Sequence, residues 1–419
     1  MRLYKAMLVL TVDQCFIYKY KKFCILLAVF FGGLTVPLWA QQAQLSDKTQ
    51  VSLITASPGN ELYTIFGHTA LRISDPVNNI NRTYNYGTFD FDTDGFYWKF
   101  ALGNLQYFLS VNQFENAKEG YLKAGRAITE QKLNLSPQQT QQLFRYLENN
   151  AKPENRYYSY EFFYDNCTTR VYDALNTVIG DSLRFQKPLN PAKNSFRQFI
   201  NPYLKSVSWV KFGINLLLGT PADRNPPESE TLFLPDLLKE GFSHARIQQA
   251  DTSLALVSEQ RFYAPQKRSV ISPASVSPTL SFWFLLITSL LAGFFYRTSH
   301  TFWFWFDRLL FGIIGLIGVL IIFLWLFSSY PSTKWNWNIL WSAPALTAFI
   351  FSFTDSKRLS GSYRVCLVLY AAILLLFLLS WSFIPQQIPS AILPLLFLLG
   401  FRSIKKQSES VNQERVNVL

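Results

Sequence analysis

The hydrophobic and polar positions divide this chain into two regions of different character. From Gln41 to Lys267, apolar residues are interleaved with Asn, Gln, Asp and Lys, as in a domain that folds in water. From Ser277 to Arg402, apolar residues form runs long enough to cross a bilayer. The pattern therefore predicts one soluble domain followed by one membrane domain.

Three segments near the start of the soluble domain have the alternating or continuously apolar pattern of β-strands. They span residues 51–57, 68–74 and 83–91. Asp, Pro and Asn residues at 75–79 are typical of a turn between the second and third segments, so these two are expected to form a hairpin.

Two later segments have the spacing of amphipathic helices. The first, 136–150, begins with Ser136, a good capping residue. The second, 166–180, begins with Asn166 as the expected cap and ends at a glycine. Cys167 is thereby placed in the first turn of the second helix, where backbone N–H groups are free.

The N-terminal segment predicts export from the cytoplasm. Basic residues, an apolar run at 23–36 and the small residue Ala40 indicate a signal peptide over residues 1–40. Leu38 is larger than the residue usually found three positions before a cleavage point, so an uncleaved N-terminal anchor is the alternative. In both cases the soluble domain, 41–270, lies outside the cytoplasm.

The membrane region, 271–402, is predicted to contain about five helices. They are expected at 279–296, 303–327, 337–353, 365–382 and 388–401. Lys and Arg concentrate in the first and third loops and after the last helix, which predicts that these parts are cytoplasmic. The tail at 403–419 is then cytoplasmic, and the soluble domain is periplasmic.

Charge and cysteine content narrow the possible functions. The formal net charge is +12, but many of the basic residues flank the apolar runs, and no basic stripe with interleaved aromatic residues is present in the sequence. A nucleic-acid partner is therefore not expected. Cys167 is the one cysteine between the N-terminal and C-terminal apolar regions, so no disulfide framework is expected. With three histidines, that thiol also provides too few ligands for a zinc site, and we expect no metal and no cofactor.

Cys167 and His68 are the candidate catalytic pair. A thiolate is stabilised at a helix N-terminus, and a neighbouring His accepts its proton. His68 begins a predicted strand, whereas His244 lies near the far end of the domain and His300 lies in a predicted cytoplasmic loop. A Cys on a helix facing a His on a strand is the arrangement of papain-like thiol enzymes. The alternative is that Cys167 is an inert small side chain and His68 is structural.

The order of these residues along the chain resembles a known arrangement. "GHTALRI", a hairpin and then "NCTTRVYDAL" resemble the circularly permuted NlpC/P60-like thiol enzymes. Over a longer range, "LITASPGNELYTIFGHTALRI", "YNYGTFDF", "YSYEFFYDNCTTRVYDAL" and "LFLPDLL", followed by a membrane tail, resemble the Bacteroidota lipoprotein N-acyltransferase (Lnb) family. The implied fold class is α+β, with a circularly permuted papain-like (NlpC/P60-type) periplasmic domain followed by an α-helical transmembrane domain.

The resemblance also implies roles for particular residues. Cys167 matches the nucleophile and His68 the general base, and an orienting residue is expected from the strand after His68. Asn85 is the preferred candidate for that role, with Tyr84, Tyr86 and Asp90 as alternatives. Asn166 and the Cys167 amide are candidate oxyanion donors, and Tyr63 is a candidate for lining the acyl pocket. The candidates for substrate binding are Arg170, Asp223 and Arg224.

The function implied by the resemblance is membrane-bound acyl transfer. A fatty acyl group would move from a phospholipid, through a Cys thioester, to the N-terminal amine of a diacylglyceryl-cysteine lipoprotein. The membrane tail suits such a reaction, because both the phospholipid donor and the lipid-anchored acceptor stay in the bilayer. The alternatives are a periplasmic cysteine amidase or peptidase acting on cell-wall peptides, and a non-enzymatic binding module.

Overall fold

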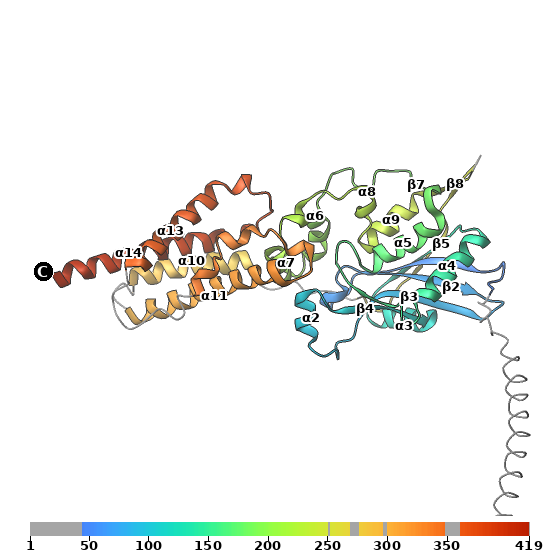
Figure 1. Cartoon of the computed structure of the whole chain (residues 1–419), viewed down its shortest axis with the longest axis horizontal. Coiled ribbons are helices and arrows are strands. Elements are labelled where there is room, and N and C mark those ends of the chain that lie inside the picture. The colour runs from blue at the N-terminus through green and yellow to red at the C-terminus, as the bar shows by residue number, and fades with distance from the viewer. Residues whose placement is uncertain (1–43, 250–251, 269–275, 296–299, 348–360, 419) are drawn as a thin grey trace, which may run out of the picture. The chain divides into compact units, whose positions relative to one another are not determined.

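The computed structural model describes residues 44–249, 252–268, 276–295, 300–347 and 361–418 (Figure 1). The predicted signal peptide at 1–40 lies outside these residues. The chain from Ser46 onward forms one unit, in which a mixed α/β domain is followed by a helical region rich in apolar residues. The predicted combination of an α/β domain and a helical membrane domain is thereby confirmed.

An antiparallel sheet of seven strands forms the centre of the α/β domain, in the order β10-β5-β1-β2-β3-β4-β6. Its strands are β1 (Gln50–Ala56), β2 (His68–Asp75), β3 (Ile80–Thr88), β4 (Gln106–Gln113), β5 (Ile128–Leu133), β6 (Tyr157–Ser159) and β10 (Val257–Tyr263). A second sheet contains β7 (Leu183–Phe185), β8 (Ala245–Gln249) and β9 (Thr252–Ala255). The predicted hairpin is confirmed as β2 and β3, which pair from Leu71 opposite Tyr84 to Asp75 opposite Ile80.

Helices cover both faces of the large sheet. Alternate residues of β2 point to opposite sides, and their contacts show which helix covers each side. On one side, Thr69 hydrogen-bonds to Thr168 of α5 (Cys167–Ile179), with 3.1 Å between the hydroxyl oxygens. On that side, too, Tyr84 of β3 donates to Glu148 of α4 (Pro137–Asn150) at 2.6 Å. On the other side, the guanidinium of Arg72 lies 3.7 Å above the ring of Phe114, at the start of α3 (Phe114–Lys123).

The N-termini of α4 and α5 are capped as the sequence predicts. Ser136 accepts a hydrogen bond from the Gln139 amide of α4, and the Gln139 side chain accepts one from the Ser136 amide. Asn166 accepts from the amides of Thr168 and Thr169 at 2.7 and 3.0 Å, which fixes where α5 begins. Both predicted helices are confirmed.

Shorter helical elements lie between the strands and longer helices of the α/β domain. They are η1 (Leu62–Thr64), α2 (Phe96–Leu102), η2 (Gly180–Ser182), α6 (Phe196–Ile200), η3 (Asn201–Leu204), α7 (Ser208–Leu217), η4 (Thr220–Asp223), α8 (Glu228–Thr231) and α9 (Pro235–Ser243).

Four long helices make up most of the described membrane region: α10 (Pro278–Phe295), α11 (His300–Phe327), α13 (Gly361–Leu379) and α14 (Leu393–Val418). They lie side by side around a shared apolar core that includes Phe311, Leu374 and Leu396 (Figure 1). By length and composition, the segments Pro278–Phe295 and Thr301–Phe327 are long enough and apolar enough to span a bilayer, and Val365–Leu379 is a shorter apolar helix.

The predicted helix at 337–353 is wrong over its described part. Residues there form two short 3-10 turns, η6 (Trp337–Leu340) and η7 (Pro344–Thr347), and residues 348–353 lie outside the described chain. Asn338 explains the departure, because its side chain donates to the Leu216 carbonyl at 3.1 Å and accepts from the Trp341 indole at 2.9 Å. These contacts compete with helical hydrogen bonding. Three further short turns border the helices: η5 (Pro331–Thr333), η8 (Trp381–Phe383) and η9 (Ser390–Ile392).

Candidate active site

The fold brings His68 and Cys167 together from separate elements. His68 is the first residue of β2, and Cys167 is the first residue of α5. The His68 side chain is hydrogen-bonded to the Cys167 sulfur. Gly67 allows the chain to enter β2 beside β1: its φ is +84°, and a Cβ there would lie only 2.9 Å from the Ala56 carbonyl oxygen.

The surroundings of Cys167 favour its thiolate form. Burial alone would raise the pKa of the Cys167 thiol, but the charge and hydrogen bond of His68 act in the opposite direction, with the Thr69 amide and the Thr168 hydroxyl contributing. The net effect is a pKa below the ordinary value for Cys. These interactions therefore favour the thiolate although the residue is only 9% exposed.

A glycine in β3 lets the strand backbone approach the thiol. Gly87 has a φ of +85°, and a Cβ there would lie 3.4 Å from the Cys167 Cβ and 3.5 Å from the Tyr160 ring. The β3–β4 pairing is irregular between Asn85 and Thr88, as expected where a strand bulges. Cys167 is thus bordered by the β3 backbone and the Tyr160 ring.

Two residues that sequence reasoning missed, Tyr121 and Arg126, complete the surroundings of His68. The Tyr121 ring centroid lies 6.2 Å from that of His68, and the Arg126 guanidinium carbon lies 5.1 Å from the Tyr121 centroid. Burial is the main cause that raises the pKa of Tyr121 to about 12, so its phenol stays neutral near pH 7. Neither residue has a motif around it that indicates a site.

Arg126 is a buried cation with spare hydrogen-bonding capacity. It is 6% exposed, its Nε donates to the Ser57 carbonyl at 2.7 Å, and its Nη2 is buried without a partner among the described residues. Burial lowers the pKa of Arg126, whereas its electrostatic interactions with Tyr121 and with the Cys167 thiolate act to raise it. Because electrostatic interactions are reciprocal, the guanidinium also stabilises the Cys167 thiolate.

Among the described residues, Asn85 forms no hydrogen bond to His68. The Asn85 amide donates to the Thr83 carbonyl at 3.4 Å, and its Oδ1 has no hydrogen-bond partner within the described chain. The alternatives also have partners other than His68. Tyr84 donates to Glu148, the Tyr86 hydroxyl accepts from Asn150 at 3.2 Å, and Asp90 accepts from the Asp92 amide at 2.9 Å.

Asn166 and Tyr63, the two other candidates near the thiol, differ in how far their side chains are free to bind a substrate. Asn166 uses its side chain to hold α5, since its Nδ2 donates to the carbonyls of Phe162 and Phe233 at 2.6 and 3.0 Å. It is therefore occupied structurally rather than free to bind an oxyanion. Tyr63 is 60% exposed and meets the rings of Phe89 and Phe91 edge-on, with centroids 5.9 Å away in each case.

Each predicted substrate-binding residue has an intramolecular partner. Arg170 forms a two-point ion pair with Asp165 at 2.5 and 2.7 Å. Asp223 accepts two hydrogen bonds from Arg197 at 2.8 and 2.9 Å in a buried ion pair. Arg224 pairs with Glu230 and donates to the Tyr164 hydroxyl. All three side chains are thus engaged within the protein, and their role in substrate binding stays a prediction.

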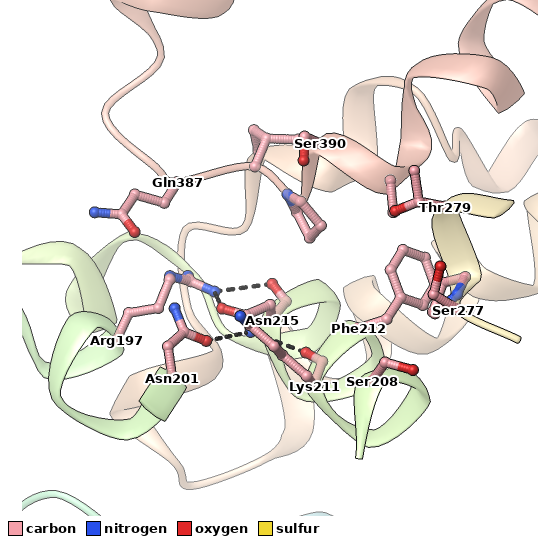
Figure 2. A pocket seen from close by; sticks show the side chains of 14 residues that line it. Arg197, Asn201, Ser208, Lys211, Phe212, Asn215, Ser277, Thr279, Gln387 and Ser390 are labelled. Carbon is pink, nitrogen blue, oxygen red and sulfur yellow. Dashed lines mark hydrogen bonds between the residues drawn. The ribbon is translucent and has the colours of Figure 1, made fainter. Parts of the chain in front are cut away.

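A separate cavity of about 280 Å³ lies between α7, the start of α10 and the segment 387–391. Figure 2 shows Arg197 turned toward Asn215, whose side-chain nitrogen donates to Asn201 at 2.9 Å. Neither Cys167 nor His68 lines this cavity, so it is distinct from the thiol site. Among the residues that the structure describes, no group of three His, Cys, Asp or Glu side chains is placed to hold a metal ion.

An α/β domain in which a buried Cys lies beside a half-buried His, followed by a helical domain with apolar spans, defines a membrane-associated protein with a thiol site. The chain belongs to the Lnb family: the model of the Lnb N-terminal periplasmic domain matches residues 36–200, and that of the Lnb transmembrane domain matches residues 270–413. Comparison with curated proteins and with solved structures gave no significant match.

The family match bears out the resemblance found in the sequence. Both His68 and Cys167 lie within the part matched to the periplasmic domain. Membership indicates an inner-membrane protein with a periplasmic domain and a role in lipoprotein maturation. The circular permutation of the NlpC/P60 type stays a prediction.

Proposed function

We propose that this protein is a lipoprotein N-acyltransferase in which Cys167 is the nucleophile and His68 the general base. The observation that carries the proposal is the hydrogen bond between these two side chains at the start of α5, together with the lowered pKa of the thiol. Family membership supports the lipoprotein as the acceptor. The phospholipid donor and the five-helix, multi-pass topology are parts of the same proposal.

In the first half-reaction, the Cys167 thiolate attacks the ester carbonyl of a phospholipid. A C–S bond forms, and the tetrahedral intermediate then expels the glycerol oxygen by breaking the C–O bond. His68 donates the proton that the leaving oxygen needs. The products are an acyl thioester on Cys167 and a lysophospholipid.

In the second half-reaction, the N-terminal amine of a diacylated lipoprotein attacks the thioester. The amine nitrogen loses a proton to His68, the C–S bond breaks, and Cys167 leaves as a thiolate. The product is an amide, and the enzyme returns to its initial state. One nucleophile serves both halves, so the two substrates react in turn.

Two donors are available for the oxyanion of each tetrahedral intermediate. Asn166 occupies the amides of Thr168 and Thr169, which leaves the Cys167 amide as the donor at the start of α5. Arg126 contributes the unpartnered Nη2. A hydrogen bond from this nitrogen to the acyl oxygen would satisfy the donor in the transition state, where the negative charge is greatest.

The direct test uses the full-length protein in lipid nanodiscs with a synthetic diacylated lipopeptide. Mass spectrometry should show the lipopeptide gaining one fatty acyl group while lysophospholipid is released. Cys167→Ala should abolish both, and Cys366→Ala is the matched control because Cys366 is also a free cysteine. Cleavage of cell-wall peptides by the same protein, without acyl transfer, would contradict the proposal and favour an amidase.

A further inference from the structure

An unusual group of exposed aromatic residues lies on and before α2. The segment 89–103 carries six aromatic rings, at Phe89, Phe91, Phe96, Tyr97, Trp98 and Phe100. Four of them form what we call the α2 patch, with exposed fractions of 57% at Phe91, 82% at Tyr97, 60% at Trp98 and 48% at Phe100. Contiguous exposed apolar surface of this kind marks an interaction site.

The α2 patch is attached to the end of a membrane-spanning helix. The Trp98 ring centroid lies 5.3 Å from that of Phe323, in the last two turns of α11. Just beyond α11, the Ser329 amide donates to the Leu102 carbonyl at 2.8 Å, and its hydroxyl donates to Gly103 at 2.9 Å. Because α2 belongs to the periplasmic domain, this end of α11 faces the periplasm.

Gly103 allows the end of α2 to lie close to Ser329. Its φ is +73°, and a Cβ there would lie 2.3 Å from the Ser329 hydroxyl oxygen. No other residue would fit without displacing Ser329. The contact places α2 at the level where α11 leaves the bilayer, the depth at which Trp and Tyr are enriched in membrane proteins.

Aromatic contacts continue from this point to the thiol. The ring of Phe96 lies 5.9 Å from that of Phe89, which lies 5.3 Å from that of Tyr107. Tyr107 stacks on Tyr160 at 4.4 Å, and Tyr160 borders the same position of Gly87 as Cys167 does. A continuous series of aromatic contacts therefore connects the α2 patch with the surroundings of Cys167.

We propose that the α2 patch inserts into the periplasmic leaflet of the inner membrane and that phospholipid acyl chains reach Cys167 along the adjoining aromatic side chains. The second part rests on the proposed function; the first does not. Asp90, Asp92 and Asp94 are exposed beside the patch, so insertion is shallow and keeps these carboxylates in water. Attraction to anionic headgroups is not the driving force, because the three carboxylates outnumber Lys99, the one cation of the segment 89–103.

Photocrosslinking tests the occupant of the patch. A photoreactive amino acid at position 97 of the full-length protein, in native membranes, should yield a lipid adduct by mass spectrometry. The matched control is position 262, where Phe262 is 59% exposed on the edge strand β10 and should give no lipid adduct. An adduct to another protein or to a second copy at position 97, or equal lipid labelling at both positions, would overturn the proposal.

A kinetic experiment tests the route. Phe91→Ser combined with Tyr97→Ser should slow the acylation of Cys167 by nanodisc phospholipid roughly tenfold, through lost apolar contact with the bilayer. Alkylation of Cys167 by iodoacetamide should be unchanged, which shows that the thiol site is folded, and Phe262→Ser should leave acylation unaffected. An unaltered acylation rate in the double variant would refute the route. If the wild-type protein forms no acyl adduct at all, the proposed function fails, while crosslinking at position 97 still decides whether the patch meets lipid.

Discussion

The imidazole of His68, at the first residue of β2, is hydrogen-bonded to the sulfur of Cys167, at the first residue of α5. The two residues are 99 positions apart in the chain, and the adjacent pair Thr69 and Thr168 repeats the contact through their hydroxyl groups. A strand and a helix therefore hold the nucleophile and the general base of the proposed reaction next to each other.

Removal of the nucleophile should abolish acyl transfer. Cys167→Ala should retain the fold, because a small apolar side chain replaces another, and should form no acyl adduct. Cys167→Ser should be nearly inactive, since its surroundings stabilise a thiolate and not an alkoxide. Acyl transfer to a lipopeptide measures the effect, and residual transfer by Cys167→Ala would show that another residue is the nucleophile.

His68→Gln should reduce acyl transfer by roughly 10²-fold or more, the range expected for a positioned base. Asn85→Ala should cost much less, because Asn85 has no hydrogen bond to His68. The rate constants of the two variants, measured with the same lipopeptide, provide the comparison. A larger loss for Asn85→Ala than for His68→Gln would reverse the assignment.

The alkylation of Cys167 should depend on pH in a way that reports the His68 interaction. The folded-state pKa of the thiol is lowered, so the thiolate should persist below the ordinary Cys value of about 8.5 and be lost only as pH falls through the lowered pKa. In His68→Gln the midpoint of the rate–pH profile should move upward. Iodoacetamide alkylation across that range measures the midpoint, and identical profiles would exclude His68 as the activator.

Arg126→Met should also raise the thiol pKa, because it removes a buried cation that stabilises the thiolate. Acyl transfer should fall further than the loss of thiolate explains if Nη2 also binds the oxyanion. Arg126→Lys should restore the pH profile but only part of the rate, since an ammonium group lacks the planar donors of a guanidinium. A rate loss in Arg126→Met with an unchanged pH profile would indicate a purely structural role.

Arg197→Met should destabilise the protein without altering the chemistry of Cys167. It leaves Asp223 as an uncompensated buried charge, which costs about 3–5 kcal/mol. The double change Arg197→Met with Asp223→Leu should recover part of that loss. Thermal unfolding of the full-length protein measures both, and normal stability with impaired substrate affinity would favour a substrate-binding role for this ion pair over a structural one.

The positions of Cys167 and His68 within their elements were predictable from local signals, and their pairing was predictable from the resemblance to thiol enzymes. A capping residue fixes the first turn of α5, and alternation fixes the start of β2. The contribution of Arg126 was not predictable, because it depends on strand order. Ala56 of β1 pairs with both His68 and Ile128, which brings the loop before β5 to the same edge of the sheet.

Contacts between the α/β domain and the membrane region were also not predictable from local sequence patterns. The apolar composition of 337–353 indicates a membrane helix, but Asn338 binds the carbonyl of Leu216 in α7, far away in sequence. The aromatic residues of α2 were likewise visible in the sequence, whereas their position beside α11 depends on a contact that no periodicity encodes.

The order of events provides the most demanding prediction. Protein given phospholipid but no lipoprotein should accumulate one fatty acyl group on Cys167. Without the lipoprotein, no amine is present to attack the thioester. The intermediate should survive long enough to be detected, since Cys167 is buried among aromatic side chains that keep water away. Intact-protein mass spectrometry should show the gain, neutral hydroxylamine should remove it, and lysophospholipid should appear in equal amount. His68→Gln should form the same adduct slowly, and Cys167→Ala should never form it. Release of lysophospholipid only when the acceptor is present, without any acylated protein, would indicate direct transfer and exclude Cys167 as the covalent carrier.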